Sequence, residues 1–470
     1  MSNLSDPIFY VFSVGEGLNS KQKIALVSTV SPVGLGDVLQ CYVGIRLLNN
    51  LLPEADITFL CPDIEEKISV FRDLNFNAHL SSVGLTRANL LKSLLPSAIS
   101  QKLPSIVNKK TITENEVDTV KPVLNKIRIV GRKCIYSPAF SNYVDSYIAK
   151  ALFSFNAGIF GGHTICTNVY KFISQYETLR SVVKGPILTF PISISKLPLE
   201  LYGDKTWKKL EQSLQKLDFI YVRGPHSLEI LRDNLNIDED RVAMALDSGF
   251  GMKLINPDII AAKGLEKKAI KIVIVPRKDY FYQYNKSNLY KHYLNSVVSL
   301  ILWLSKNFDA EVYLTNQTVD YDPMGDRTAI TDVVRLLKKR AKNNRCLKFL
   351  RIVESNTLID AYRLYASADL VITSRMHAGV MALSSDIPVI FLIPSSDVKI
   401  LDIISFLGLD TKPFLIDIFN FNELKAENLI NKTENVIENM EYYQKLIKAA
   451  VQKNLPTIEN PVRHLAKLLG

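Results

Sequence analysis

The sequence lacks the cysteine patterns that mark metal-binding or disulfide-stapled proteins. Its 470 residues include five cysteines, and no two of them form a C-x-x-C pair. An odd number of scattered cysteines argues against a disulfide framework and against a zinc site. Cys41 and Cys61 stand in apolar surroundings and are predicted to be buried thiols. Free thiols are typical of a reducing compartment, so we expect a cytoplasmic protein without a metal site.

Long hydrophobic runs, internal repeats and low-complexity segments are also missing. The longest apolar stretches, such as residues 297–304, are far too short to span a bilayer. The N-terminus has no basic residues ahead of its apolar part, so we expect no signal peptide. With 47% hydrophobic and 22% charged residues, the composition is that of an ordinary globular protein. A chain of this length can form two or three domains, each with its own core.

Positive charge is concentrated in one segment. Residues 86–133 hold ten basic and three acidic residues, so they carry seven of the ten net positive charges. The simpler interpretation is a solvated basic insertion. The alternative is a peripheral contact with an anionic membrane or an acidic saccharide, helped by leucine pairs at nearly helical spacing. No nucleic-acid partner is expected, because no aromatic residues are interleaved with the basic ones.

Apolar runs of strand length alternate with helical patterns along most of the chain. This alternation predicts parallel, doubly wound sheets, and it is interrupted by a charged, proline-containing stretch at residues 253–268. The predicted fold class is α/β, with two doubly wound, Rossmann-like halves facing a cleft in a GT-B-like arrangement. Residues 1–255 form the first half and 256–420 the second, while 421–470 are helices that pack back on them. Strands are expected near residues 23–30, 56–61, 153–160, 186–191, 219–222, 242–246, 269–275, 311–314, 349–353, 370–372 and 389–393.

The stretch from residue 368 to 388 is the most informative part of the chain. Residues 370–372 are a short β-branched run typical of a buried parallel strand. A polar corner with Arg375 and His377 follows, and then a helix that opens on small residues and can therefore lie close to the sheet. Ligands of open α/β sheets bind at such strand ends, and a helix N-terminus favours anions. The sequence therefore predicts an anion site at this corner.

Other predicted strands also end in glycine or polar residues that could face the same cleft. They include Gly36 and Asp37 after the first strand, Gly161, Gly162 and His163, Arg223 with Ser227, Arg277, and Lys399. The first glycine turn is not a full dinucleotide fingerprint, since Leu39 stands where the third glycine would be.

In order and spacing these elements resemble the polysaccharide pyruvyltransferase family. Residues 371–392 resemble its strand, R-x-H and helix signature. Two positions depart from the family pattern: Val33-Gly34 replaces Gly-Asn, and Gly224 replaces the Asp after Arg223. The other matching elements are residues 34–37 (a G-N-x-G-D turn), 161–162 (a glycine run), 221–231 (V-R-D-x-x-S), 247–250 (D-x-x-F), and 397–399 with 407–409.

The resemblance implies transfer of a pyruvyl group from phosphoenolpyruvate to sugar hydroxyls, which forms a cyclic ketal and releases phosphate. Such a donor carries a phosphate and a carboxylate, which arginine forks bind well. Arg375 and Arg223 are the predicted catalytic cations, and His377 is the predicted general acid/base. The expected partners are phosphoenolpyruvate and a saccharide or lipid-linked saccharide, with no further cofactor. Predicted substrate-binding residues are Arg277, Lys399, Ser227, Gly36, Asp37, Gly161, Gly162 and His163.

Each of these residues also has a structural interpretation, and two other functions stay open. The structural alternative for Arg375 and His377 is to cap a helix without binding a ligand. For Asp37 it is to cap the first helix, and for Arg223 it is to form a salt bridge. A glycosyltransferase with a nucleotide-sugar donor could use the same two-half architecture. A non-catalytic saccharide-binding relative is the other alternative, supported by the two departures.

Overall fold

The computed structural model describes most of the chain outside one long N-terminal stretch. The basic segment 86–133, Val33, Gly34 and His163 lie outside the described residues. The described ranges are residues 9–14, 22–27, 35–62, 81–83, 155–162, 164–165, 169–196, 200, 203–256, 269–318, 325–341 and 348–470.

The second half is built on a six-stranded sheet in which every neighbouring pair is parallel. The strand order is β13-β12-β11-β14-β15-β16, the order of a doubly wound nucleotide-binding fold. In this order the chain changes direction between β11 and β14, which makes their carboxyl ends the switch point of the sheet. Every residue of β14 and β15 is buried, as the short β-branched runs predict. The strands are β11 (Ile270–Val275), β12 (Ala310–Thr315), β13 (Leu350–Val353), β14 (Leu370–Thr373), β15 (Val389–Ile393) and β16 (Leu415–Asp417).

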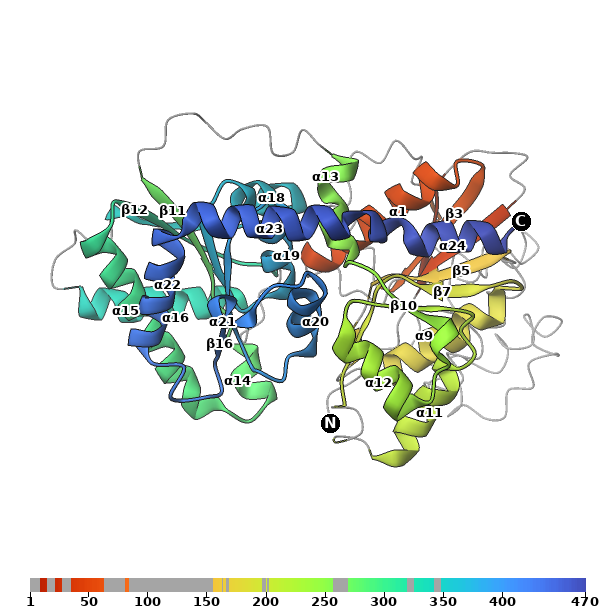
Figure 1. The fold of residues 1–470 in the computed structure, drawn as a ribbon, viewed down its shortest axis with the longest axis horizontal. Helices are drawn as coiled ribbons and strands as arrows, with labels where there is room; N and C mark the ends of the chain where they lie inside the picture. The colour runs from red at the N-terminus through yellow and green to blue at the C-terminus, as the bar shows by residue number, and fades with distance from the viewer. Residues whose placement is uncertain are drawn as a thin grey trace, which may run out of the picture.

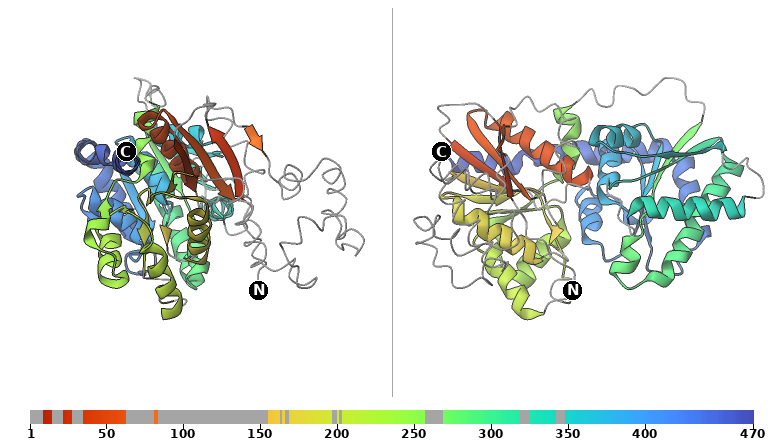
Figure 2. Two further views of the ribbon diagram at one scale, coloured as in Figure 1. Left: turned by 90° about the vertical axis from the view of Figure 1, so that its right-hand side faces the viewer. Right: turned by 180° about the vertical axis from the view of Figure 1, so that it is seen from behind.

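Helices cover both faces of this sheet (Figures 1 and 2). The small residues after β14 have the predicted effect, because a Cβ added at Gly379 would lie 2.2 Å from the ring of Phe391 in β15. Helix α19 can therefore pack directly on its sheet. The helices are α14 (Asp279–Gln283), α15 (Ser287–Asn307), α16 (Asp326–Arg340), α18 (Leu358–Ala366), α19 (Met376–Ser384), α20 (Val398–Phe406) and α21 (Thr411–Phe414).

The first half has a mixed sheet with the order β4-β1-β3-β2-β5-β7. Strand β1 is antiparallel to both of its neighbours and was not predicted, whereas β3, β2, β5 and β7 are parallel. The strands are β1 (Phe9–Val14), β2 (Gln22–Val27), β3 (Ala55–Pro62), β4 (Ser81–Val83), β5 (Ala157–Phe160), β7 (Ile187–Thr189), and the short pairs β6 (Thr164–Ile165) with β8 (Ser193–Ile194) and β9 (Ile220–Val222) with β10 (Val242–Met244). Its helices are α1 (Leu35–Leu51), α9 (Val169–Val182), α11 (Asp204–Leu214), α12 (Pro225–Leu235) and α13 (Met252–Ile255), with the 3-10 turn η4 (Ser248–Gly251).

The C-terminal helices connect the two halves. Helix α22 (Ala426–Glu438) packs on α15, α23 (Met440–Asn454) packs on α19, and α24 (Asn460–Leu468) returns to α1 and β7 of the first half. Figure 1 shows this dark-blue segment crossing the whole molecule. Within the helical segment predicted for residues 421–470, Asn439 ends α22 and precedes α23.

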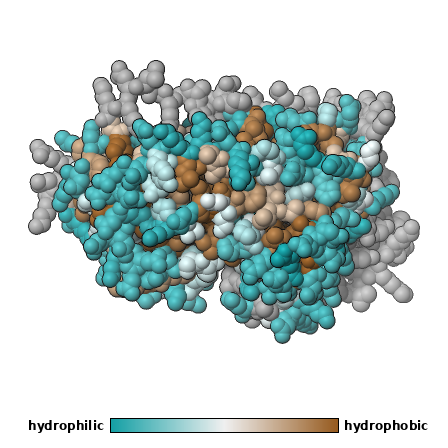
Figure 3. Space-filling view, in the orientation of Figure 1, coloured by the Kyte–Doolittle hydropathy of each residue, from teal (hydrophilic) through white to brown (hydrophobic). Residues whose placement is uncertain are grey.

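The described residues give one face of the molecule a mainly polar surface (Figure 3). On the face shown in Figure 3, hydrophilic residues cover both halves, and hydrophobic residues interrupt them mainly across the middle. Within the described ranges, no helix has the length and apolar character needed to cross a membrane.

Candidate functional site

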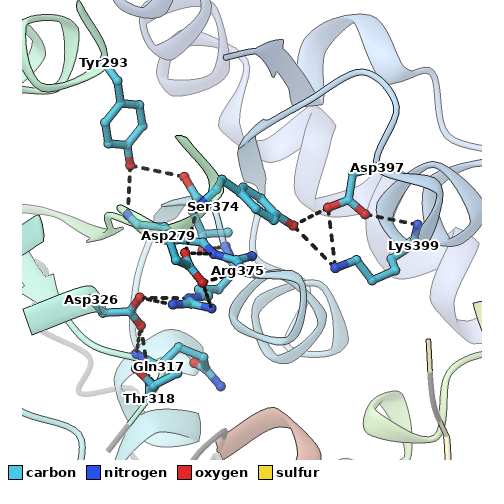
Figure 4. Close-up of polar contacts among 12 residues, drawn as sticks. Asp279, Tyr293, Gln317, Thr318, Asp326, Ser374, Arg375, Asp397 and Lys399 are labelled. Carbon is cyan, nitrogen blue, oxygen red and sulfur yellow. Dashed lines mark hydrogen bonds and ion pairs between the residues drawn. The ribbon is translucent and has the colours of Figure 1, made fainter. Parts of the chain in front are cut away.

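The two predicted arginines of the second half flank the switch point. Arg277 follows β11, and Arg375 follows β14, the strand paired directly with β11. A chain of polar contacts ties the two strand ends together. The Arg277 backbone N–H donates to the Tyr293 hydroxyl (3.2 Å), which in turn lies 3.1 Å from Ser374 Oγ (Figure 4). The sheet therefore places both guanidinium groups at one edge, where α/β folds bind ligands.

The guanidinium group of Arg375 is held by a buried carboxylate. Its Nε and Nη2 donate to Asp326 Oδ1 at 2.8 and 2.6 Å (Figure 4). Asp326 is fully buried, and its Oδ2 accepts the backbone N–H groups of Gln317 (2.8 Å) and Thr318 (3.2 Å). Arg375 makes no side-chain capping bond to the helix that follows it. Asp326 therefore fixes the direction of Arg375 and is itself fixed by the backbone.

Arg277 forms an ion pair with Asp279 and stacks on an aromatic ring. It donates through Nε to Asp279 Oδ1 and through Nη2 to Oδ2 (2.7 Å). Its guanidinium carbon lies 3.4 Å from the ring centre of Tyr280, a short cation–π contact. Asp279 Oδ2 also lies 3.6 Å from Nη1 of Arg375. Burial alone would raise the pKa of Asp279, but Arg277 and Arg375 hold it at about 2.

Lys399 reaches the same cluster from helix α20. Its ammonium nitrogen lies 3.4 Å from the Tyr280 hydroxyl and 3.7 Å from Asp397 Oδ2. The Tyr280 hydroxyl donates to Asp397, whose Oδ1 accepts the Lys399 backbone N–H and caps α20. Tyr280 therefore connects Lys399 with Arg277. Asp279 and Tyr280 belong to the short helix α14, which the tyrosine-rich segment after Arg277 forms.

His377 lies against the first half of the molecule. A Cβ added at Gly36, in the first turn of α1, would lie 2.1 Å from both Cγ and Nδ1 of His377. Only glycine leaves room for this contact. Burial lowers the pKa of His377 to about 4, with Arg223 and Lys399 adding to the effect and Asp247 opposing it. Its Nε2 is buried and has no hydrogen-bond partner among the residues that the structure describes. The imidazole is therefore neutral at pH 7 and has an unused polar nitrogen.

Arg223 is buried in an ion pair of the first half. Only 1% of its side chain is exposed, and its Nε donates to Asp247 Oδ2 at 2.5 Å. Asp247 is fully buried, accepts a bond from Gln40 Nε2 (2.6 Å), and bonds the Gly249 N–H (2.8 Å). The salt bridge that the sequence left open for Arg223 is thus present. Its charge still reaches the site, since it affects the pKa of His377.

Ser227 forms hydrogen bonds between the two halves and does not lie at the switch point. It lies in the first turn of α12, where its backbone N–H donates to Asp402 Oδ1 (3.1 Å) and its hydroxyl donates to Oδ2. Asp402 belongs to α20 of the second half and is fully buried. A Cβ at Gly224 would lie 2.3 Å from the Asp402 carbonyl oxygen. At Gly224 the family pattern has an Asp. In this chain the Asp402 carboxylate of the second half lies there instead and binds a backbone N–H in the first turn of α12.

The remaining predicted residues lie around the first helix. Asp37 is in the first turn of α1. Gly161 is buried just after β5, and a Cβ at Gly162 would lie 2.8 Å from Gln40 Nε2. Gly162 thus lies beside the residue that binds Asp247. His163 is outside the described residues, so its predicted role stays a prediction.

Five carboxylates of this region were not among the predicted site residues, and one of them is Asp397, which binds Lys399 and the Tyr280 hydroxyl. Asp279 and Asp326 bind the arginines of the switch point, Asp247 binds Arg223, and Asp402 binds Ser227. The Gly325-Asp326 pair at the start of α16 is a helix-start signal that could have pointed to Asp326. For Asp402, inside an apolar helical pattern, the sequence holds no comparable signal. Among the described residues, no group of three or more histidine, cysteine or acidic side chains could hold a metal ion.

The fold is shared with solved structures of very different sequence. A Listeria monocytogenes protein named as a UDP-N-acetylglucosamine 2-epimerase matches at a TM-score of 0.51 with 11% identity, covering 94% of each chain. The UDP-GlcNAc 2-epimerase of Neisseria meningitidis, solved with UDP-GlcNAc, gives 0.49 with 11% identity over 95% of this chain and 99% of its own. A search of curated proteins found no match. The likeness to the Listeria protein defines the class of fold, two Rossmann-like halves in the GT-B arrangement with a C-terminal helical segment.

The family is settled by a match over most of the sequence. Residues 35–396 match the family described as polysaccharide pyruvyl transferase. The chain belongs to the polysaccharide pyruvyl transferase family, a family of transferases. The matched range begins at helix α1 and ends after β15, so it includes Gly36, Arg223, Arg277, Arg375 and His377.

Proposed function

We propose that this chain transfers a pyruvyl group from phosphoenolpyruvate to two hydroxyls of a saccharide in surface or exopolysaccharide synthesis. The observation that carries the proposal is the pair Arg277 and Arg375 at the switch point, with neutral His377 beside it on the next helix. Family membership supports this reaction class. Two arginine forks suit the carboxylate and phosphate of the donor. Lys399 adds a third cation on the same side through Tyr280.

The proposed chemistry conserves atoms and protons. The first sugar hydroxyl adds through oxygen to C2 of the donor, while C3 gains a proton and becomes a methyl group. The second hydroxyl then displaces phosphate from C2 and its proton leaves with the phosphate, so the products are a cyclic ketal and hydrogen phosphate. His377, being neutral at pH 7, accepts the proton of the attacking hydroxyl and returns one to C3. Arg223 acts from the first half through its charge near His377.

A panel of saccharide acceptors tests this function directly. The chain is incubated with phosphoenolpyruvate and each acceptor, and the products are analysed by mass spectrometry and phosphate release. We expect a pyruvyl ketal on at least one acceptor. His377→Ala should lower the rate about a hundred- to ten-thousand-fold. His292→Ala is the matched control, since His292 is exposed on α15 and packs on Phe421.

Other outcomes would identify the alternatives. Release of nucleotide from a nucleotide sugar, with no phosphate from phosphoenolpyruvate, would show a glycosyltransferase. Saccharide binding that His377→Ala leaves intact, with no turnover of either donor, would show a binding protein.

We further propose that the acceptor is lipid-linked and is met in the cytoplasm at an anionic membrane surface. The charge of residues 86–133 motivates this step. Sedimentation with vesicles containing phosphatidylserine should decrease when the segment is deleted. Unchanged sedimentation of the deletion variant would refute the membrane contact.

A further inference from the structure

The cations at the switch point are already neutralised by carboxylates of the chain. Arg277 is paired with Asp279, Arg375 with Asp326 and more loosely with Asp279, and Lys399 with Asp397. The described side chains thus give three positive and three negative charges in this cluster. A donor that carries both a phosphate and a carboxylate must compete with at least one of these carboxylates to bind here.

The carboxylates differ in how firmly the protein holds them. Asp326 is fully buried and accepts two backbone N–H bonds from Gln317 and Thr318 besides the arginine. Asp397 caps α20 through the Lys399 N–H and also receives the Tyr280 hydroxyl. These two carboxylates have a structural role at the carboxyl end of the sheet, because removing them would leave buried hydrogen-bond donors unsatisfied.

Asp279 has a different environment. Its side chain is 15% exposed and lies at the start of α14, a helix of only five residues. Within the described part of the chain, its carboxylate accepts one backbone N–H, that of Tyr280 (3.1 Å), and its other bonds go to Arg277. With Arg375 3.6 Å away, its carboxylate lies between two guanidinium groups (Figure 4). This is the arrangement that a carboxylate or phosphate group of a ligand would make.

We propose that Asp279 is an internal competitor that occupies the anion position between Arg277 and Arg375 until an anionic donor replaces it. The inference rests on the proposed function for the identity of the donor, but the anion position itself is defined by the geometry. A small rotation of the Asp279 side chain frees the Arg277 fork and the near side of Arg375. Asp326 keeps Arg375 in place during the exchange.

The competing interpretation predicts the opposite change in anion affinity when Asp279 is removed. If Asp279 only orients Arg277, its removal leaves a misdirected arginine and weakens anion binding. If it competes, its removal strengthens binding. An internal group that occupies the position about nine-tenths of the time lowers the apparent affinity about tenfold.

The experiment compares binding of phosphoenolpyruvate and of inorganic phosphate by calorimetry. Asp279→Asn should bind phosphoenolpyruvate about tenfold more tightly than the natural chain. Asp332→Asn is the matched control, because Asp332 has a similar side-chain exposure (17%) and pairs with Lys278 and Arg335 outside the arginine pair. It should leave the affinity unchanged. Asp279→Ser serves as a second variant, and thermal unfolding confirms that each variant is folded.

The outcomes separate this inference from the proposed function. Equal or weaker binding of phosphoenolpyruvate by both Asp279 variants refutes the competitor and leaves the donor assignment intact. Tighter binding of phosphate but none of phosphoenolpyruvate upholds the anion position and refutes the donor. Absence of binding of either anion to all variants refutes both.

Discussion

A methyl group added at Gly36 tests the contact that joins the halves at His377. The new Cβ would lie 2.1 Å from His377 Cγ and Nδ1 and 2.2 Å from its Cβ. The clash involves the root of the side chain, which cannot swing away without moving helix α19. Overpacking of this kind costs about 1–3 kcal/mol. Alanine in place of glycine inside a helix returns at most about 1 kcal/mol. We therefore expect Gly36→Ala to lower the free energy of unfolding by up to about 2 kcal/mol.

The same substitution should change the titration of His377. A pKa of about 4 instead of the ordinary 6.5 means that the folded chain favours the neutral imidazole by roughly 3 kcal/mol. The stability linked to this group is present above pH 6.5 and is lost as the pH falls towards 4. If the methyl group pushes the ring towards solvent, its pKa should rise towards 6.5. NMR of isotope-labelled histidine measures this without any substrate, and urea denaturation measures stability.

Gly44→Ala is the matched control in the same helix. Its Cβ would lie 3.0 Å from the edge of the Phe190 ring, within the first half and away from His377. We expect a small change in stability and an unchanged His377 pKa. The reasoning is refuted if Gly36→Ala is more stable than the natural chain while the pKa of His377 stays at about 4.

Further predictions concern the boundary between the halves and the charges around His377. Gly224→Ala should lower the free energy of unfolding by about 1–3 kcal/mol in urea denaturation, because its Cβ would meet the Asp402 backbone at 2.3 Å; an unchanged value contradicts this contact. Asp247→Asn should cost about 3–5 kcal/mol, since it leaves the Arg223 charge buried without its partner, and a cost below 1 kcal/mol would show that the pair is not buried. Burial raises the pKa of Asp402, so the stability linked to its protonation is present below pH 3.8 and is lost as the pH rises. Asp402→Asn should therefore flatten this part of the pH–stability curve. An unchanged curve would contradict the raised pKa. Binding of phosphoenolpyruvate should raise the pKa of His377 above about 4, because nearby negative charge favours imidazolium, and NMR titration showing no rise would place the donor elsewhere.

The sequence by itself located five of the six strands of the second-half sheet, whereas β16 (Leu415–Asp417) and the order of the strands in the sheet were not predicted. Residues 370–372 and 389–393 are short β-branched runs, and they form the fully buried strands β14 and β15. Period and composition are local properties, so they can be read without a structure. The same holds for the R-x-H corner, whose position after a buried strand already indicated a ligand-binding edge. The family that the corner and its neighbouring elements resemble is confirmed by the match over residues 35–396.

Only the tertiary structure decided which charges meet. Arg375 and Asp326 are 49 positions apart, and Ser227 and Asp402 are 175 positions apart, yet both pairs are bonded. Pairing over such distances depends on how strands are ordered in a sheet and how two halves dock, and no local pattern encodes this. The sequence therefore located the cations of the switch point, whereas the fold supplied the carboxylates that neutralise them, because burying a charge requires a partner from wherever the chain brings one.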